Sequence, residues 1–329
     1  MKLLSFLKNK ALGSSIDYKI LPRKVKFDWK DTPVDWIPNQ PFASYFINEI
    51  NNILPAGEFW FCRLYNKVLP QIKDEKLKQD VQAFIRQEAM HANAHTSANK
   101  EYLSARNIDI QRNLDIMNYL FTTALADKPF DKEVPQFLQG QWDLLRLGVI
   151  ATVEHMTCVL GKYALYNTRW EELGADPEMV DLVKWHGSEE IEHRTVAFDL
   201  YRHLDGGYIP RYYLSLAVIV LVLGLWVDGA AHIMKQDPRF ADAAKSRFFP
   251  VWVAVEWYKI SRKDNQVLPN PFWLIAQQID YLMPWYDPVK EGSTEDAVSY
   301  LSQSPAAKKS RVTSGLKIKK QDLKSCFFI

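Results

Sequence analysis

The sequence predicts an all-α protein, a four-helix bundle with additional helices at its C-terminal end. Long segments repeat apolar residues with a period of 3.6, and almost no segment alternates as a strand would. Two helical segments, a long crossover and two more helical segments follow one another, the order found in bundles with one long link between their halves. The 329 residues are 47% hydrophobic and 13% aromatic, a globular composition with enough chain for a sizeable core.

Proline positions and changes of periodicity divide the chain into parts. Residues 1–40 contain Pro22, Pro33 and Pro38 without a sustained period, and we expect them to form an extended arm on the domain. The bundle is expected over residues 41–205. Its four helices and one short helix in the crossover are predicted over residues 56–70, 74–106, 140–167, 177–204 and 116–125.

The chain after the bundle has a different character. Residues 206–301 are rich in tryptophan and predict additional helices packed on the bundle or on a membrane. Within them, residues 212–227 carry no charge, but these sixteen residues are fewer than the about twenty that a span needs. The segment is either a core helix, covered by the bundle or by the second subunit of a homodimer, or a helix lying on a membrane surface. Residues 302–329 predict a basic, flexible tail.

Charge and cysteine content narrow the classes of partner. The net charge is +2, but residues 306–329 carry seven Lys or Arg against one Asp, so the preceding chain is slightly acidic. This leaves no broad basic surface, and no nucleic-acid partner is expected. The three cysteines have neither disulfide nor metal spacing, and the apolar stretch at residues 3–7 is too short for an export signal. We expect a cytoplasmic protein that its basic tail and residues 212–227 can attach to the inner face of the membrane.

Each half of the predicted bundle contains one lone glutamate followed by a Glu-x-x-His motif. An i, i+3 spacing puts a carboxylate and an imidazole on the same face of a helix, so four helices can direct four carboxylates and two imidazoles to one point. This is the ligand set of two-metal carboxylate proteins with a ferritin-like bundle. The residues are Glu58, Glu88 and His91 in the first half, and Glu154, Glu190 and His193 in the second.

A single Glu-x-x-His motif is usually a solvated or hydrogen-bonded pair, so the alternative to a metal site needs weighing. Here two copies occur, both on otherwise apolar helix faces. Six ionisable groups buried without a metal would each lose several kcal/mol of solvation. The repeat therefore favours a metal centre, and carboxylates with imidazoles suit iron, or alternatively manganese.

Two more histidines lie one helical turn from proposed ligands. His186 precedes Glu190 by four residues and is expected to be an additional ligand. His95 follows His91 by four residues and is expected either to bind metal or to hydrogen-bond a ligand.

Neighbours of the proposed ligands have other expected roles. Glu189 and Glu192 flank the ligand face and are expected to point to solvent, and His155 points away from the apolar stripe that holds Glu154. Small residues on the ligand faces either leave room for an apolar small-molecule substrate or allow close helix packing. They are Ala92, Ala151, Cys158 and Gly161.

The motifs resemble known families. The chain carries Gly57-Glu58, Phe84-Ile85-Arg86-Gln87-Glu88-Ala89-x-His91, Glu154-His155 and Trp185-His186-x-x-Glu189-Glu190-x-Glu192-His193. Over about residues 40–290, these motifs resemble the bacterial family labelled predicted metal-dependent hydrolase, within the ferritin-like superfamily. The spacing is also similar to that of p-aminobenzoate N-oxygenases, whose di-iron centre has seven protein ligands. The matching residues here are Glu58, Glu88, His91, Glu154, His186, Glu190 and His193.

The leading functional hypothesis is a non-haem di-iron oxygenase or oxidase that acts on an apolar small molecule. Two iron ions would be bridged by Glu88 and Glu190, held terminally by Glu58 and Glu154, and supplied with dioxygen. A metal-dependent hydrolase that uses a metal-bridging water is the first alternative. Non-catalytic metal binding is the second.

Overall fold

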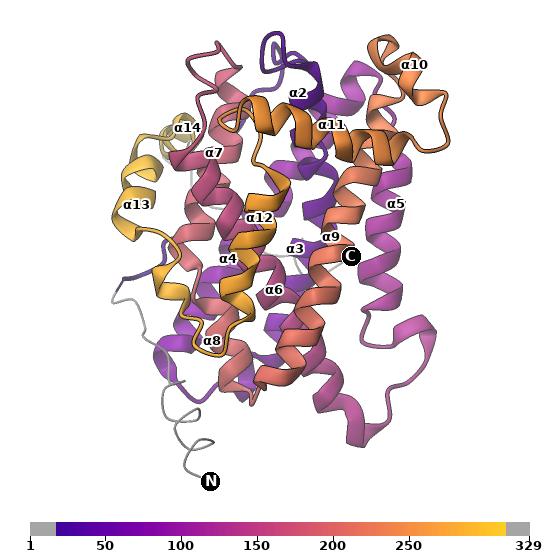
Figure 1. Cartoon of the computed structure of the whole chain (residues 1–329). Helices are drawn as coiled ribbons and strands as arrows, with labels where there is room; N and C mark the ends of the chain where they lie inside the picture. Colours follow the sequence, from indigo (N-terminus) through magenta and orange to yellow (C-terminus); the bar gives the residue numbers. More distant parts are fainter. Residues whose placement is uncertain (1–17, 314–329) are drawn as a thin grey trace.

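The computed structural model describes residues 18–313, and every regular element in that range is a helix (Figure 1). The predicted all-α class is therefore confirmed. The start of the predicted arm, residues 1–17, and most of the predicted tail, residues 314–329, lie outside the described residues.

Four helices form the centre of the bundle: α3 (Ile50–Val68), α4 (Glu75–Ser97), α6 (Gln139–Tyr166) and α7 (Pro177–His193). Helix α3 packs along α4, and α6 packs along α7. Contacts between α4 and α7, and between α3 and α6, join the two pairs. These are the four helices that the sequence predicts.

Three helix boundaries differ from the prediction. Helix α3 begins at Ile50, six residues earlier than expected, because Pro55 lies inside it without ending it. Helix α4 ends at Ser97, and the chain continues as a π-helical turn (Ala98–Leu103) and a 3₁₀ turn (Ser104–Arg106). The predicted helix over residues 177–204 is two helices, because the chain turns at residues 194–195 before α8 (Val196–His203) begins.

The crossover between the two helix pairs contains more helix than expected. Helix α5 (Gln111–Tyr119) starts five residues before the predicted position and continues into a π-helical turn (Leu120–Ala124). It packs against α3. Short 3₁₀ turns at Pro129–Asp131 and Gln136–Leu138 lead into α6.

Residues 18–40 contain no helix and lie against the bundle. The Trp29 indole donates to the Ser97 hydroxyl at 2.6 Å, and the backbone N–H of Asp176 donates to the Trp36 carbonyl at 2.7 Å. The arm is thereby fixed to the end of α4 and the start of α7. Helix α2 (Pro41–Asn48) follows it.

The remaining helices cover the α6–α7 side of the bundle. Helices α9 and α12 pack on α6 and on each other, and α11 packs on both. Helices α13 and α14 pack on α7. Their bounds are α9 Tyr208–Met234, α10 Ala241–Ala244, α11 Phe249–Lys263, α12 Pro271–Leu282, α13 Thr294–Gln303 and α14 Pro305–Thr313.

Part of the segment that the sequence predicted as a flexible tail is helical. Helix α14 runs from Pro305 to Thr313, and Ala306 and Ala307 are buried. The Asp181 carboxylate of α7 accepts from the backbone N–H of Ala306 at 2.8 Å, which anchors the start of α14. Despite their polar composition, residues 305–313 form a helix that packs on α7.

Two described helices are long and apolar enough to cross a membrane by length and composition, over Gln136–Tyr166 and Tyr208–Met234. A buried core helix passes the same test, and the first of these is largely buried in the bundle. The second, α9, is buried along only part of its surface. Helix α9 is therefore covered on one side, and residues on its other side are exposed.

Candidate metal centre

All eight side chains that the sequence singles out as ligands or possible ligands lie together in the middle of the bundle. They are buried, and none is more than 6% exposed. Helix α3 contributes Glu58, α4 contributes Glu88, His91 and His95, α6 contributes Glu154, and α7 contributes His186, Glu190 and His193.

Capping side chains define the first residues of α4 and α7. The Asp74 carboxylate accepts from the Leu77 N–H at 2.8 Å and caps α4. At the start of α7, Asp176 accepts from two backbone N–H groups at 3.1 Å, and Pro177 occupies the first helical position. Because each helix begins at a defined residue, its Glu-x-x-His face points in a defined direction.

A glycine pair brings α6 and α7 into backbone contact next to the centre. A Cβ atom on Gly161 would lie 2.4 Å from the Gly187 carbonyl oxygen, and one on Gly187 would lie 2.6 Å from the Gly161 Cα. No side chain fits at either position. This close approach lets Glu154 and Glu190 reach the same point, so Gly161 serves helix packing, one of its two predicted roles.

One group of potential ligands surrounds His193. Its Nε2 atom lies 3.1 Å from a Glu154 oxygen, 3.4 Å from a Glu190 oxygen and 3.6 Å from a Glu88 oxygen. The four donor atoms of this group all lie within 4.8 Å of one another. Such a spacing accommodates one metal ion.

A second set of donors lies beside the first and uses two of the same carboxylates. The His91 Nδ1 atom lies 3.2 Å from a Glu88 oxygen and 3.5 Å from a Glu190 oxygen. Glu58 joins Glu88 and His91 in one compact group, and His186 joins His91 and Glu190 in another. Since Glu88 and Glu190 belong to both sets, they lie where bridging carboxylates would lie.

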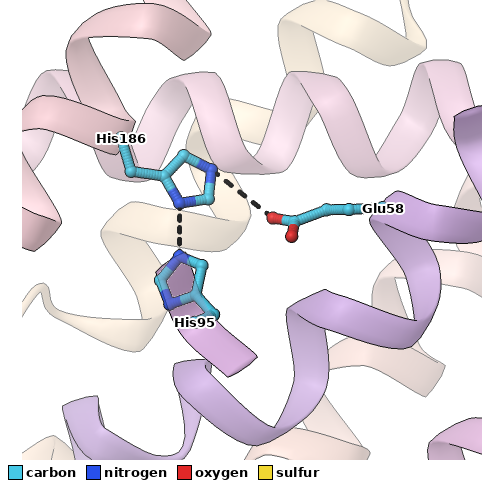
Figure 2. A group of neighbouring side chains, drawn as sticks. All are labelled: Glu58, His95 and His186. Atoms are coloured by element: carbon cyan, nitrogen blue, oxygen red, sulfur yellow. Dashed lines mark hydrogen bonds and ion pairs between the residues drawn. The ribbon is translucent and has the colours of Figure 1, made fainter. Parts of the chain in front are cut away.

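His186 stands between the carboxylates and His95 (Figure 2). Its Nε2 atom faces Glu190 at 2.8 Å and Glu58 at 3.7 Å, whereas its Nδ1 atom is 2.6 Å from the His95 Nε2 atom. The other His95 nitrogen lies 2.8 Å from the Asn51 side-chain oxygen. His186 therefore presents a nitrogen to the centre, and His95 is placed to hydrogen-bond His186 from behind. Glu58, His95 and His186 also form a compact group of three donors, so His95 keeps both predicted roles.

The donor atoms that converge on the centre lack hydrogen-bond partners within the described part of the chain. They are both Glu58 oxygens, Glu88 Oε1, His91 Nδ1 and His193 Nε2. A buried polar atom left without a partner costs about 1–3 kcal/mol, and more when the group is charged. Metal ions at this position would satisfy these atoms together, so the residues fit a two-metal centre.

The electrostatics of the buried carboxylates also indicate that the centre needs additional positive charge. Burial raises the pKa of Glu58 and of Glu154 well above the usual range, and the carboxylates nearby raise both further. Burial is the largest single influence on Glu190 and acts against its ionisation, but the combined effects of His193 and His186 outweigh burial and lower the pKa of Glu190. One imidazolium thus offsets one carboxylate. Ionisation of all four carboxylates needs additional cations, which a pair of divalent metals would provide.

The histidine nitrogens that point away from the centre are both held. The His91 Nε2 atom lies 3.1 Å from a Glu189 carboxylate oxygen. The His193 Nδ1 atom lies 3.0 Å from the Gln87 side-chain oxygen. Partners of this kind fix the tautomer and orientation of a ligating imidazole.

Arg23 of the N-terminal arm connects these two partners. Its guanidinium donates to Glu189 at 3.1 Å and to both oxygens of Glu192, at 2.6 and 2.9 Å. The Gln87 amide in turn donates to Glu192 at 2.6 Å. One arginine from the arm is therefore linked to the orientation of His91 through one glutamate and to that of His193 through the other.

The prediction that Glu189 and Glu192 point to solvent was wrong. Both are buried, at 0% and 2% exposed, because α4 and the arm cover the flanks of the ligand face of α7. The prediction for His155 was correct. It lies outside the centre, with its ring nitrogens 2.9 Å from the Tyr286 hydroxyl and 3.2 Å from the Gln277 carbonyl.

Comparison with known proteins bears on the whole of this site. A sequence model of the family described as predicted metal-dependent hydrolase matches residues 21–292. The chain belongs to this family. No curated protein and no solved structure matches it. The matched range contains Arg23 and all eight residues of the centre, so the family assignment and the clustered donors together indicate metal dependence.

In this member of the predicted metal-dependent hydrolase family, the centre borders a cavity of about 330 Å³. The polar side chains in its wall are Thr157 and six of the eight site residues, together with the edge of the Trp226 indole. Thr157, which the sequence analysis missed, donates to Glu190 at 2.5 Å. The rest of the wall is glycine, aliphatic, thioether or aromatic, so most of the cavity suits an apolar molecule.

Proposed function

We propose that this protein holds two iron ions at the centre and uses them to activate dioxygen for the oxidation of an apolar substrate. One observation carries the proposal: two sets of carboxylate and imidazole donors share Glu88 and Glu190 and open onto an apolar cavity. Oxygen and nitrogen donors of this kind suit iron, with manganese as the alternative. The same ligand pattern occurs in ferritin-like bundles.

The residues divide between two metal positions. Glu58, His91 and His186 would hold the first ion, and Glu154 and His193 the second. Glu88 and Glu190 would contact both. The bound iron pair would supply the electrons that reduce dioxygen.

The protein itself supplies orientation and a dry environment. The Thr157 hydroxyl donates to Glu190, and the Arg23 network holds the imidazoles, so both orient donors toward the centre. The apolar wall places substrate carbon atoms next to the centre and keeps bulk water away from it.

Hydrolysis is the second candidate, and the family description favours it. Two metals that share carboxylates can lower the pKa of a bound water. The cavity argues against it. Apart from the proposed ligands and His95, its wall offers Thr157 and the Trp226 N–H, which already donate to Glu190 and to the Phe46 carbonyl. An ester or phosphoryl group would therefore depend on the metal ions alone to stabilise its developing negative charge.

Metal storage is the third candidate. The cavity opens to the surface beside the centre, and Leu145 and Leu221 line its exposed edge. Aliphatic side chains are a poor lining for the passage of hydrated iron. The apolar wall therefore favours a substrate over a stored ion.

A pair of assays separates the candidates. Anaerobic protein loaded with ferrous iron is mixed with dissolved oxygen, and oxygen consumption and visible absorption are followed. We expect rapid consumption of oxygen with two irons bound per chain. The same protein loaded with zinc or manganese is assayed with p-nitrophenyl esters. Ester hydrolysis without oxygen consumption by the iron form would replace the proposal with the hydrolase, and two bound irons without either reaction would favour storage.

A further inference from the structure

We propose that the protein docks on an anionic lipid bilayer through the outer face of α9 and α12, and that the acyl chain of a membrane lipid enters the cavity from this face. The inference rests on the proposed function for its chemistry, because it names a lipid acyl chain as the apolar substrate. The docking and the access route rest on separate observations.

The outer side of α9 exposes no charged side chain over four turns. Arg211, the charged residue within residues 209–224, is buried and donates to the Tyr281 and Met283 carbonyls. Val220 is 72% exposed, although it is an aliphatic residue in the middle of a long helix. The exposed side consists of Ile209, Pro210, Tyr213, Leu216, Ala217, Val220, Leu221 and Gly224.

Helix α12 extends the same face. Helices α9 and α12 lie side by side on α6 (Figure 1), so their sides opposite α6 both point outward. Asp280, near the C-terminal end of α12, is exposed and charged, and the other exposed residues of this helix are apolar. They are Phe272, Ile275, Ala276 and Ile279. An apolar surface that extends over two helices marks a docking site.

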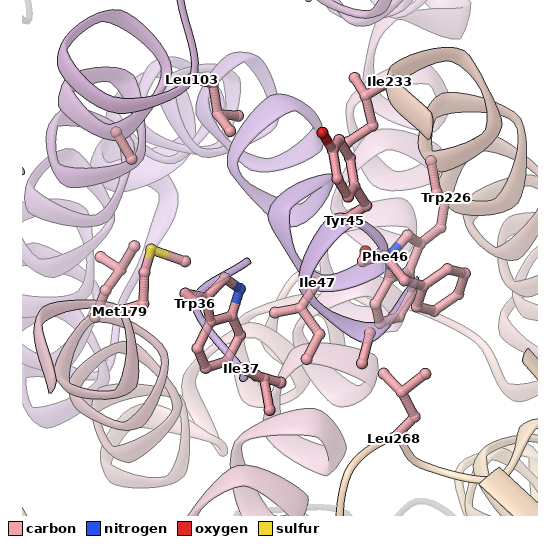
Figure 3. Packing of buried hydrophobic residues seen from close by; sticks show 14 of the residues in the cluster. Trp36, Ile37, Tyr45, Phe46, Ile47, Leu103, Met179, Trp226, Ile233 and Leu268 are labelled. Carbon is pink, nitrogen blue, oxygen red and sulfur yellow. Dashed lines mark hydrogen bonds between the residues drawn. The ribbon is translucent and has the colours of Figure 1, made fainter. Parts of the chain in front are cut away.

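The inner side of α9 shows what a covered surface looks like in this protein (Figure 3). Trp226 stacks on Phe46 with ring centroids 4.9 Å apart, and its indole donates to the Phe46 carbonyl at 2.7 Å. Ile233 is fully buried on the same helix. The outer side has a similar composition but no such partners within the described chain, so its apolar residues are not required for the core.

The cavity reaches the surface at the edge of this face. Ala217 and Leu221 are one turn apart on α9, and both are exposed and also line the cavity. Leu145 of α6, 40% exposed, lines it as well. The mouth is therefore bordered by the apolar stripe, and Glu58 and Glu190 line the same cavity at the centre. A chain could pass from the face to the metal centre without crossing a polar surface.

The rim of the face has the chemistry of a bilayer interface. Trp285, after α12, is 72% exposed, and Arg247 lies over the exposed Phe248 ring at 4.6 Å. On α11, exposed Val255 is followed one turn later by exposed Lys259, which pairs with Glu256 at 3.2 Å, and two turns later by exposed Arg262. Amphipathic aromatic rings lie at headgroup level, and each cation near an anionic surface contributes about 1 kcal/mol.

A bilayer explains the face and the cavity together. It covers both helices, meets the basic rim with anionic headgroups, and delivers acyl chains at the cavity mouth. Each CH₂ group that moves into an apolar environment gains about 0.8 kcal/mol relative to water. A second copy of the chain would also cover the face but would block the mouth, and it is the competing occupant.

The docking test uses full-length, metal-free protein in flotation with phosphatidylglycerol vesicles and with phosphatidylcholine vesicles. Wild type should float with the first and much less with the second. Val220→Glu should lower the bound fraction roughly tenfold or more, because burying a carboxylate costs several kcal/mol. Leu21→Glu is the matched control, since Leu21 is 47% exposed on the arm and lies outside this face. Circular dichroism checks that each variant folds.

The access test uses the same vesicles doped with a pyrene-labelled phosphatidylglycerol. Wild type should take the label into the cavity, and Leu145→Trp, on α6 and outside the docking face, should bind vesicles normally but lose uptake, because the larger side chain narrows the mouth. Failure of wild type to float, or a dimer in solution that Val220→Glu dissociates, would overturn the docking. Equal uptake by Leu145→Trp would overturn the route. Since no metal is present, failure of the iron protein to consume oxygen would leave these results unchanged and would count against the proposed function alone.

Discussion

The two halves of the centre repeat the same residue types but differ in how each histidine is held. In the α4 motif, His91 turns Nδ1 toward Glu88 and places Nε2 on the carboxylate of Glu189. In the α7 motif, His193 turns Nε2 toward the carboxylates and places Nδ1 on the neutral amide of Gln87. The repeat in sequence therefore produces an asymmetric site.

This difference predicts two inequivalent metal positions. A carboxylate that accepts from an imidazole makes the ring a stronger donor, whereas an amide oxygen mainly fixes its orientation. The first position also has a second imidazole, His186, within reach. We infer that the position beside His91 binds metal more tightly than the position beside His193. The spacing of motifs thus fixes where donors lie, and residues outside the motifs set how strong they are.

The largest expected effect separates shared from unshared carboxylates. Glu190 belongs to both donor sets and Glu154 to one, so Glu190→Ala should lose most of both metals and Glu154→Ala only one per chain. Metal content by mass spectrometry measures this, with Glu101→Ala, at an exposed position, as control. If Glu190→Ala still bound both metals fully, Glu190 would not be a bridging ligand.

The next effect tests the additional imidazole. His186→Phe keeps the helix and most of the side-chain volume, so the chain should fold while the first position loses a nitrogen donor. Metal titration should show one weakened site and one unchanged site. If stoichiometry, affinity and absorption spectra all match wild type, His186 is a core residue and no ligand.

A smaller effect tests the inferred difference in affinity between the two metal positions. Glu189→Gln preserves shape and can still accept from Arg23, but it removes the charge behind His91. Affinity of the first position should fall by about 10- to 100-fold, and that of the second should change little. Calorimetric titration of the metal-free protein measures both. An equal loss at the two positions would contradict the inferred difference between the halves.

A further prediction concerns stability and not metal binding, and it involves a buried acid outside the centre, Glu49. Burial raises the pKa of Glu49 to about 8, against the lowering effect of hydrogen bonds from Asn52 and Asn113; the charges of Asp228 and Arg112 have smaller effects. The folded state therefore keeps a proton that the unfolded chain releases above about pH 4.5. Stability should fall as pH rises from there to about 8 and level off above it.

Replacing this acid provides the test. Glu49→Gln should remove that part of the pH dependence and stabilise the protein at pH 8 by an amount on the order of a few kcal/mol. Urea unfolding of metal-free protein at several pH values checks the slope. An unchanged profile would show that Glu49 ionises in the folded protein as it does in water.

The sequence was sufficient to predict which side chains meet at the centre. The three-residue spacing in each motif and one lone glutamate in each half gave six residues, and the four-residue spacing to His186 and His95 gave two more; the structure brings all eight together. The reason is that helical geometry alone converts such spacing into a common face. The helix ends were harder to predict from the sequence. Pro55 lies inside α3 without ending it, and the chain turns between α7 and α8.

The network around the centre could not be predicted in the same way. Arg23 is 166 residues from Glu189 in sequence and lies on an arm without periodicity. Glu189 and Glu192 were assigned to solvent because only one face of α7 was expected to be covered. The arm packs over the flank of this face, and its Arg23 pairs with both buried glutamates. The one local signal was composition, since two further glutamates stood within a helix that proved to be buried on nearly every side.

Anomalous diffraction at the iron edge, from crystals grown anaerobically with ferrous iron, tests the central claim most directly. We predict two peaks about 3.5–4 Å apart, the spacing of two-metal sites. One should lie beside His91 and His186, and the other beside His193 and Glu154. A single peak, or iron bound away from the space between Glu88 and Glu190, would contradict a two-metal centre in this protein.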